Sequence, residues 1–298
     1  MRLKMPFGIS NYEELIRDGY YYVDKTKYIE KLENLPEKRI MFLRPRKFGK
    51  TLFTSVIENY YDKNKADEFE LLFKNTYIGK NPTKNKNRYC ILRFNFSGID
   101  TSSEEAPITL DSLTSGFNIG TDITQDIDFN DMMGFTQNEL IDILNNQGVS
   151  KEEQEEILPI MKENYDGYKF SLNAENRIYN SNMCLYFLSR YIRLKEIPND
   201  LIDMNIASDY SKIGKMLDLC KGEKRLDILR KTVQGETITN TLVEKFNPAI
   251  EFTEIDMISM LYYLGYLTIS GELIGIPELA IPNNVMKEIY KDNYEQRR

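Results

Sequence analysis

Three consecutive residues, Gly49, Lys50 and Thr51, have the types and spacing that phosphate chemistry requires. The P-loop pattern is a glycine, four residues and then Gly-Lys-Ser/Thr, and here Arg44 stands where the first glycine belongs. In such a loop the second glycine lets the backbone approach a phosphate, the lysine reaches the terminal phosphates, and the Thr51 hydroxyl ligates magnesium. The sequence therefore predicts a site for ATP and Mg2+ at Arg44–Thr51.

The neighbouring sequence predicts a strand before this loop and a helix after it. Arg39–Leu43 contains a short apolar run, consistent with a buried strand, and Thr51–Tyr61 has apolar residues at helical spacing. The loop amides would then lie at a helix N-terminus, where the helix dipole favours an anion. The alternative is a surface loop that only caps a helix. Basic residues at a helix start argue against that alternative, because the dipole disfavours cations there unless an anion is bound.

The composition excludes several kinds of site. Histidine is absent, which rules out Ser-His-Asp and Cys-His nucleophiles and histidine-ligated zinc. The three cysteines are far apart and are typical of a reducing cytoplasm, without a disulfide framework. No apolar run is long enough to span a bilayer and no signal-peptide pattern begins at Met1, so we expect a cytoplasmic protein with no membrane partner. The functional groups that remain suit phosphate binding: carboxylates, Lys, Arg, hydroxyls and backbone amides.

The charge is unevenly distributed along the chain. A net charge of −7 argues against a globally basic nucleic-acid binder. Basic stretches without an acid nevertheless run from Lys38 to Lys50 and from Lys74 to Arg93. The second stretch is either a solvated loop or the surface of a DNA-associated module. From Glu254 to the end, seven acids outnumber four bases, which is the wrong sign for phosphate contact.

Local patterns predict further elements. Capping boxes, each marking the start of a helix, are expected at Ser10–Glu13, Thr136–Glu139 and Ser150–Glu153. Strands are expected at Tyr20–Val23 and Tyr89–Phe96, which are rich in aromatic and β-branched residues. Helices are expected at Ser181–Leu194, Asp203–Leu229 and Thr237–Phe246.

The last segment has a distinct order of elements. Thr253 begins a helix that ends at Gly265. Two strands, Tyr266–Ile269 and Leu273–Ile276, then enclose a turn at Ser270-Gly271, and a final helix starts at Pro282-Asn283. Helix, hairpin and helix is the order of a winged-helix subdomain, for which the excess of acids favours domain packing over DNA binding.

The octapeptide Arg44–Thr51 resembles the Arg-Pro-Arg-Arg-Phe-Gly-Lys-Thr signature of the bacterial AAA-ATPase-like family, whose members often carry a C-terminal PD-(D/E)XK nuclease-like domain. In that family an arginine also replaces the first glycine. Further stretches resemble family landmarks: Pro6–Ile9 with Tyr22–Thr26, Pro107–Ile119, Tyr165–Phe170 and Leu264–Ile269.

The resemblance implies a set of nucleotide-binding residues. These are Arg44, Arg46, Lys47, Phe48, Gly49, Lys50 and Thr51. Weaker nucleotide-side candidates are Asp24, Lys25 and Asp111. A plain helix cap would explain Asp24 equally well, and a Ser- and Thr-rich turn would explain Asp111 without a ligand.

Two departures from the family pattern bear on catalysis. The family places a strand ending in the Walker B acids between Tyr89–Phe96 and Pro107, but the paired acids found there, Glu104-Glu105, follow serines rather than a strand. We therefore expect little ATP hydrolysis, and a segment skipped between about residues 101 and 107. The chain also ends soon after the winged-helix-like segment, so we expect no nuclease domain; a nuclease-type or DNA partner stays open.

As a whole, the sequence predicts an α/β P-loop NTPase-like core, a helical lid region and a C-terminal winged-helix-like subdomain. The expected boundaries are 1–130, 131–250 and 251–298, with the core incomplete near 101–107. The leading hypothesis is an ATP-binding protein that could act as an ATPase. The alternatives are a nucleotide-independent interaction or regulatory module with a degenerate P-loop, and a DNA-associated module.

Overall fold

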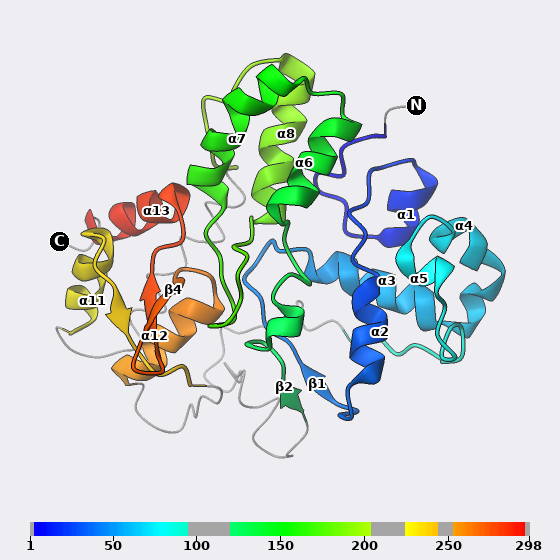
Figure 1. Ribbon diagram of the computed structural model, residues 1–298, viewed down its shortest axis with the longest axis horizontal. Coiled ribbons are helices and arrows are strands. Elements are labelled where there is room, and N and C mark those ends of the chain that lie inside the picture. Colours follow the sequence, from blue (N-terminus) through cyan, green and yellow to red (C-terminus); the bar gives the residue numbers. More distant parts are fainter. Residues whose placement is uncertain (1–2, 95–119, 204–223, 244–252, 296–298) are drawn as a thin grey trace.

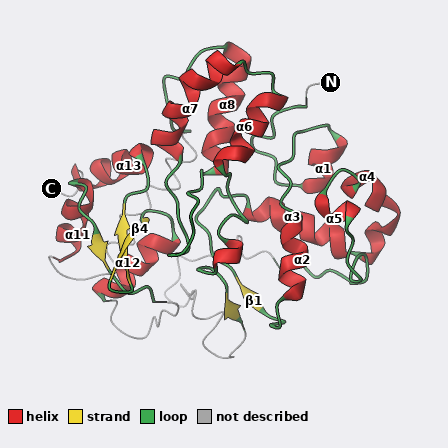
Figure 2. Cartoon of the chain, viewed as in Figure 1, coloured by secondary structure: helices red, strands yellow, loops and turns green. Residues whose placement is uncertain are grey.

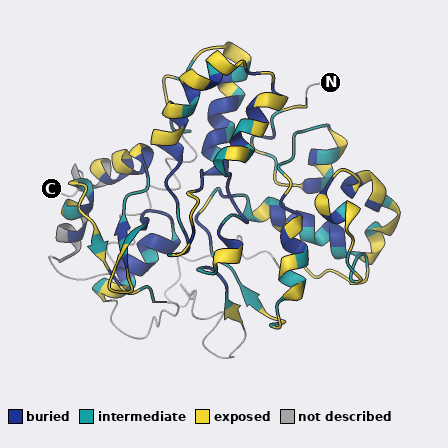
Figure 3. Cartoon of the chain, viewed as in Figure 1, coloured by how far each residue is buried: buried dark blue, intermediate teal, exposed yellow. Residues whose placement is uncertain are grey.

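The computed structural model describes residues 3–94, 120–203, 224–243 and 253–295. It is a mixed α/β structure in which helices dominate and strands are short (Figure 2). Three groups of elements surround central segments that are largely buried (Figures 1 and 3). A shared hydrophobic core joins the groups, with residues from Tyr12 in the first to Tyr290 in the last.

The first group contains the N-terminal helices and a small parallel sheet. Its elements are α1 (Tyr12–Arg17), α2 (Lys27–Asn34), β1 (Ile40–Met41), α3 (Lys50–Tyr61), η1 (Lys63–Glu68), α4 (Phe69–Phe73), α5 (Tyr77–Lys80), β2 (Thr121–Asp122) and η2 (Ile127–Phe129). Strand β1 pairs in parallel with β2, with Ile40 opposite Thr121 and Met41 opposite Asp122. A parallel pair whose first strand leads through a loop into a helix is compatible with a P-loop-like core.

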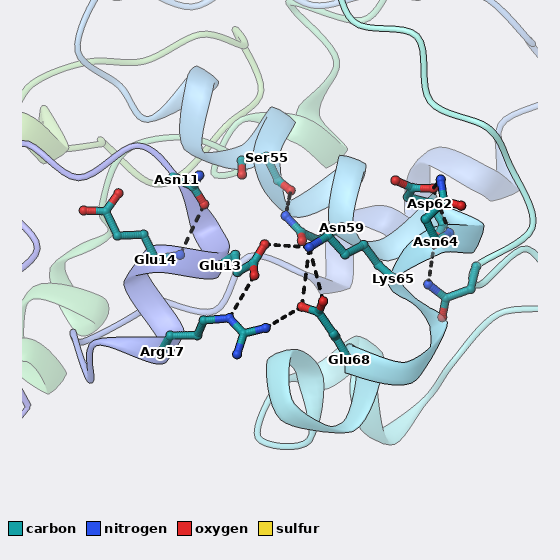
Figure 4. A network of polar contacts seen from close by, with 11 residues as sticks. Asn11, Glu13, Glu14, Arg17, Ser55, Asn59, Asp62, Asn64, Lys65 and Glu68 are labelled. Carbon is teal, nitrogen blue, oxygen red and sulfur yellow. Dashed lines mark hydrogen bonds and ion pairs between the residues drawn. The ribbon is translucent and has the colours of Figure 1, made fainter.

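Polar contacts tie α1 to η1, the short helix that follows α3. Glu13 pairs with Arg17 within α1, and the carboxylate of Glu68 and the ammonium of Lys65 extend the network to η1 (Figure 4). The capping box predicted at Ser10 is wrong. The helix cap is Asn11, one residue later, and its side chain accepts from the N–H of Glu14.

Both additional strands predicted for the first group are wrong. At Tyr20–Val23 only Tyr20 forms an isolated bridge, to Lys4. At Tyr89–Phe96 the described part, up to residue 94, has a single bridge from Tyr89 to Asp62. Strand propensity is expressed only where a neighbouring strand supplies partners, and the 77% exposure of Leu92 indicates that the described residues offer none there.

The middle group is helical, as predicted. It contains α6 (Gln137–Asn146), α7 (Lys151–Tyr165) and α8 (Ser181–Leu194). The capping boxes at Thr136 and Ser150 are confirmed, each with reciprocal bonds to the glutamate three residues later. The bounds of α8 are those expected from the sequence. Whether this group acts as a lid stays a prediction.

The C-terminal group packs helices around an antiparallel sheet. Its elements are α11 (Lys224–Val233), β3 (Ile238–Thr239), α12 (Glu254–Tyr263), β4 (Thr268–Leu273), β5 (Ile276–Ala280) and α13 (Asn284–Glu295). The predicted order of helix, hairpin and helix is confirmed, and Thr253 caps α12 as expected. The turn lies at Ile274-Gly275 instead of Ser270-Gly271, because Leu273 pairs with Ile276. The winged-helix assignment stays a prediction.

The helix predicted at Thr237–Phe246 is wrong within its described part. Ile238 and Thr239 form β3 and pair with Leu279 and Glu278 of β5, so sheet pairing overrides the helical pattern.

Two other expectations fall mostly outside the described residues: the discontinuity near 101–107, and the helix at 203–229, of which α11 covers the last part. The domain boundaries stay predictions.

Candidate functional site

The predicted order of strand, glycine-containing loop and helix is confirmed. Strand β1 ends at Met41, and α3 begins at Lys50. Gly49 caps the helix with a φ of 91°, a left-handed conformation that favours glycine. Lys50 and Thr51 therefore lie in the first helical turn, whose N–H groups have no partner within the helix.

A cavity of about 570 Å³ borders this loop. Four of its lining residues are cationic, namely Lys25, Arg46, Lys47 and Lys50, and among the described residues that line it there is no aspartate or glutamate. Apolar side chains line other parts of the wall, among them Val23, Leu52, Met132, Phe135 and Leu185. Its size is within the range of small-molecule and cofactor sites, and the combination suits a ligand with an anionic end and an apolar end.

Lys50 is folded against its own loop. Its Nζ donates to the carbonyl oxygens of Arg44, at 2.7 Å, and Pro45, at 2.6 Å. Burial, with smaller contributions from the charges of Arg46 and Arg44, lowers the pKa of Lys50 to about 8. The side chain thus remains mainly protonated at pH 7, in an environment that an anion would improve.

Arg44 lies behind the loop and not on the cavity wall. Its guanidinium donates to the carbonyl oxygens of Leu43, Thr124 and Phe129, each at 2.8 Å. It is also 4.1 Å from the ring centroids of both Phe42 and Phe170. Burial lowers the pKa of Arg44 to about 9, which leaves it charged at pH 7. The side chain holds the loop to the core, and its predicted contact with nucleotide stays untested.

The middle of the loop is fixed by Phe48. Its ring packs edge-on against Tyr168, with centroids 4.9 Å apart, and against Phe170 at 5.6 Å. Its carbonyl oxygen accepts from the N–H of Gly134 at 3.2 Å. A Cβ at Gly134 would lie 2.4 Å from a methyl group of Ile178, so only glycine fits there.

A second glycine supports the start of the loop. A Cβ at Gly265, which follows α12, would lie 2.4 Å from the Cβ of Pro45. Tyr262 of α12 donates its hydroxyl to the carbonyl of Phe170, at 2.9 Å. The stretches 165–170 and 264–269, distant in sequence, therefore meet behind the same loop.

The first turn of α8 contacts the loop from another side. The N–H of Asn182 donates to the carbonyl oxygen of Lys47 at 3.2 Å, and the hydroxyl of Ser181 to the same oxygen at 3.3 Å. Sequence reasoning missed Gly134, Ser181 and Asn182 as site residues. Gly134 lies beside the capping box at Thr136, and Ser181 and Asn182 begin the predicted helix Ser181–Leu194, so their sequence signals indicate structure and not ligand contact.

The nucleotide-side candidates separate into three cases. Lys25 lines the cavity, and its Nζ donates to Asp131 O at 2.8 Å and contacts the Glu139 carboxylate at 2.7 Å. Burial lowers the pKa of Lys25, and Glu139 acts in the opposite direction. Asp24 instead accepts from Thr26 and from the N–H of Tyr77, a turn-stabilising role away from the cavity wall. Asp111 lies outside the described residues.

Thr51 meets the first requirement of a magnesium ligand. Its side chain is exposed at the start of α3 and lines the cavity. Within the described part of the chain, no cluster of three or more acidic or cysteine side chains could hold a metal. Magnesium often keeps several waters and takes substrate phosphates as ligands. A hydroxyl beside this loop would therefore suit Mg2+ that arrived with a nucleotide.

Fold and loop together define a mixed α/β protein with a P-loop-like strand–loop–helix unit beside a cationic cavity. The chain belongs to the AAA-ATPase-like family, whose model, described as "Predicted AAA-ATPase", matches residues 6–195. The matched region includes the loop, the cavity wall and α8. Membership implies nucleotide and metal use in general.

Comparison with curated proteins adds a relative of limited overlap. A protein of Azotobacter chroococcum mcd 1, named "Uncharacterized protein in vnfD 5'region", is 35% identical over 100 residues. The match covers 33% of this chain and 18% of that protein, so the chain spans a small part of its relative's length. No solved structure matches the chain. No described helix is long and apolar enough to cross a membrane.

Proposed function

We propose that the protein binds ATP in the cavity beside Arg44–Thr51. The observation that carries the proposal is the lining of that cavity, in which four cations and no described acid surround the N-terminus of α3. The first-turn amides and the helix dipole add to the attraction for phosphate. The apolar part of the wall suits a nucleobase.

In this proposal each loop residue has its own role. Lys50 exchanges its two carbonyl partners for terminal phosphate oxygens. Thr51 ligates Mg2+ through its hydroxyl, and Arg46 and Lys47 add positive charge at the cavity wall. Lys25 is held by Glu139 and contributes less net charge.

The site favours ATP binding without efficient ATP hydrolysis. A hydrolytic P-loop site uses a carboxylate to hold magnesium and to place the attacking water. None lines the cavity among the described residues. A DNA-associated role has less support, since two members of the basic stretch have partners within the chain: Lys86 lies over the Phe69 ring and Arg93 pairs with Glu58.

A titration with fluorescent N-methylanthraniloyl-ATP and Mg2+ tests the proposal. We expect saturable binding that K50A weakens about tenfold or more, equivalent to about 1.4 kcal/mol. The matched control is K74A, an exposed lysine outside the cavity. At ATP concentrations about 100 times Kd, the wild type should gain about 2.7 kcal/mol of stability against unfolding. No binding by the wild type would support a nucleotide-independent module, whereas equal binding by wild type and K50A would place the nucleotide away from Lys50.

The magnesium role has a separate test. T51A should lose most of the difference in affinity between Mg2+ and EDTA conditions, because the hydroxyl ligand is gone. T54A is the control: Thr54 is exposed on the same helix and its hydroxyl donates to the carbonyl of Lys50. An unchanged Mg2+ effect in T51A would remove Thr51 from the metal site.

A further inference from the structure

Lys47 has a backbone conformation that lysine rarely adopts. Its φ is 68°, in the left-handed region, where the Cβ of an L-residue crowds the carbonyl oxygen. Gly49, two residues later, is also left-handed, but glycine has no Cβ to crowd. Such strain persists only where surrounding structure holds the backbone in place.

The holding contacts come from the first turn of α8. The carbonyl oxygen of Lys47 accepts from the N–H of Asn182 and from the hydroxyl of Ser181. Ser181 is 7% exposed, and its Oγ would be 3.8 Å from a Cβ on Gly49, so it is packed against the loop. The start of the helix is itself held, because the Asn180 side chain accepts from the N–H of Met183 and the N–H of Asn180 donates to the carbonyl of Tyr165.

These bonds determine the direction of the loop amides. In a planar trans peptide the C=O and the following N–H point in opposite directions. Holding the carbonyl of Lys47 on the α8 side therefore fixes the N–H of Phe48 on the other side. The Gly134 bond to the carbonyl of Phe48 fixes the N–H of Gly49 in the same manner. Backbone N–H groups fixed in advance are what anion binding in a loop requires.

We propose that Ser181 and Asn182 are positioning residues of the phosphate loop. They hold the Lys47 peptide in its strained, binding-competent conformation, through a side-chain hydroxyl and a backbone N–H respectively. The inference rests on the proposed nucleotide function. It assigns the start of α8, 130 residues beyond the loop, to the same site. The affinity for nucleotide then depends on how the middle group packs against the loop.

A four-protein cycle tests the hydroxyl of Ser181: wild type, S181A, K47G and the double variant K47G/S181A. Nucleotide affinity is measured with N-methylanthraniloyl-ATP and Mg2+. We expect S181A to weaken binding about fivefold, the effect of one hydrogen bond. In the K47G background the same substitution should have an effect below about twofold, because glycine adopts the left-handed conformation without help. The cycle cancels the loss of the Lys47 charge, which is common to both K47G proteins.

The backbone bond of Asn182 needs a different pair of variants. Proline is tolerated in the first turn of a helix and lacks the N–H. N182P should therefore bind nucleotide about fivefold more weakly than N182A, which removes only the side chain. S189A serves as the matched control for S181A, because Ser189 lies on the same helix and its hydroxyl donates to Tyr186, away from the cavity. Circular dichroism and thermal midpoints measured without nucleotide verify that each variant folds.

The outcomes separate this inference from the function on which it rests. If the wild type does not bind the probe, both fall. If the wild type binds and S181A and N182P match S189A and N182A, the proposed function stands and the positioning role is wrong. If S181A weakens binding equally with Lys47 and in the K47G background, Ser181 acts on the ligand or on the fold as a whole, and the positioning role is again overturned.

Discussion

The Nζ of Lys50 lies 2.7 Å from the carbonyl oxygen of Arg44, six residues earlier in the same loop, and donates a hydrogen bond to it. The carbonyl of Pro45 accepts a second bond. The ammonium is thus held by neutral acceptors in a partly buried position. A phosphate would replace them with charged oxygens, which form stronger hydrogen bonds.

The first prediction is a pH dependence of nucleotide affinity. Burial and the neighbouring arginines lower the pKa of Lys50 to about 8, and bound phosphate would raise it again. The complex therefore holds a proton that the free protein loses above about pH 8. Affinity should be full below that pH and fall as the pH rises, by at most about tenfold per unit. Isothermal titration calorimetry at pH 7 and pH 9 would measure the change.

Arginine at the same position supplies the control for this titration. K50R keeps its charge at pH 9, so its affinity should change less between the two pH values than that of the wild type. Equal slopes for wild type and K50R would show that another group titrates.

The second prediction concerns the contact between Gly265 and Pro45. In G265A the new Cβ would lie 2.4 Å from that of Pro45, at a φ of +83°. We expect the free energy of unfolding to fall by about 2–4 kcal/mol through overpacking and strain, with weaker nucleotide binding. The control G235A has the same φ but open space around the added methyl, so it should lose only about 1 kcal/mol. Urea denaturation would compare them, and equal losses would contradict the steric argument.

A third prediction follows from the buried guanidinium of Arg44. R44K should lower the free energy of unfolding by about 3 kcal/mol, because lysine cannot reproduce the planar set of bonds or the stacking on two rings. The exposed Arg88 offers the matched variant R88K, with an expected change within about 0.5 kcal/mol. If R44K is as stable as R88K but loses nucleotide affinity, Arg44 acts on the ligand and not on the loop.

Hydrolysis provides the fourth prediction. With no described acid on the cavity wall, steady-state phosphate release from ATP should stay near the level of K50A, which serves to subtract contaminating activity. The measurement is a phosphate-release assay at saturating ATP and Mg2+. Turnover well above that of K50A would show that a carboxylate reaches the site.

Local sequence signals predicted the elements whose determinants are local. The capping boxes at Thr136 and Ser150 and the bounds of α8 follow from neighbouring residues alone. Strands depend on distant partners, so Tyr20–Val23 and Tyr89–Phe96 had the composition of strands but not the neighbours. The hairpin was predicted, but its turn was placed on Ser270-Gly271, although Gly271 lies within β4.

The same division holds for the candidate site: its loop could be predicted from the sequence, but the contacts that support the loop could not. The glycine, lysine and threonine of the loop are recognisable because their spacing along the chain matches the P-loop pattern. The support from α8 was not, since a backbone N–H such as that of Asn182 carries no sequence signal. Arg44 shows what the sequence could not reveal: its contact with nucleotide stays a prediction, while its partners in the structure are carbonyls and rings from residues up to 126 positions away.

The contacts that hold the phosphate loop are spread along nearly the whole chain, through Thr124, Gly134, Tyr168, Ser181 and Gly265. Such long-range contacts are slow to form, because chain entropy is lost before they stabilise the structure. Synthesis runs from the N-terminus, so the loop leaves the ribosome long before Gly265 does. The proposed nucleotide site would therefore be completed late, and a nascent chain would acquire full affinity for the proposed ligand only after most of its length has emerged.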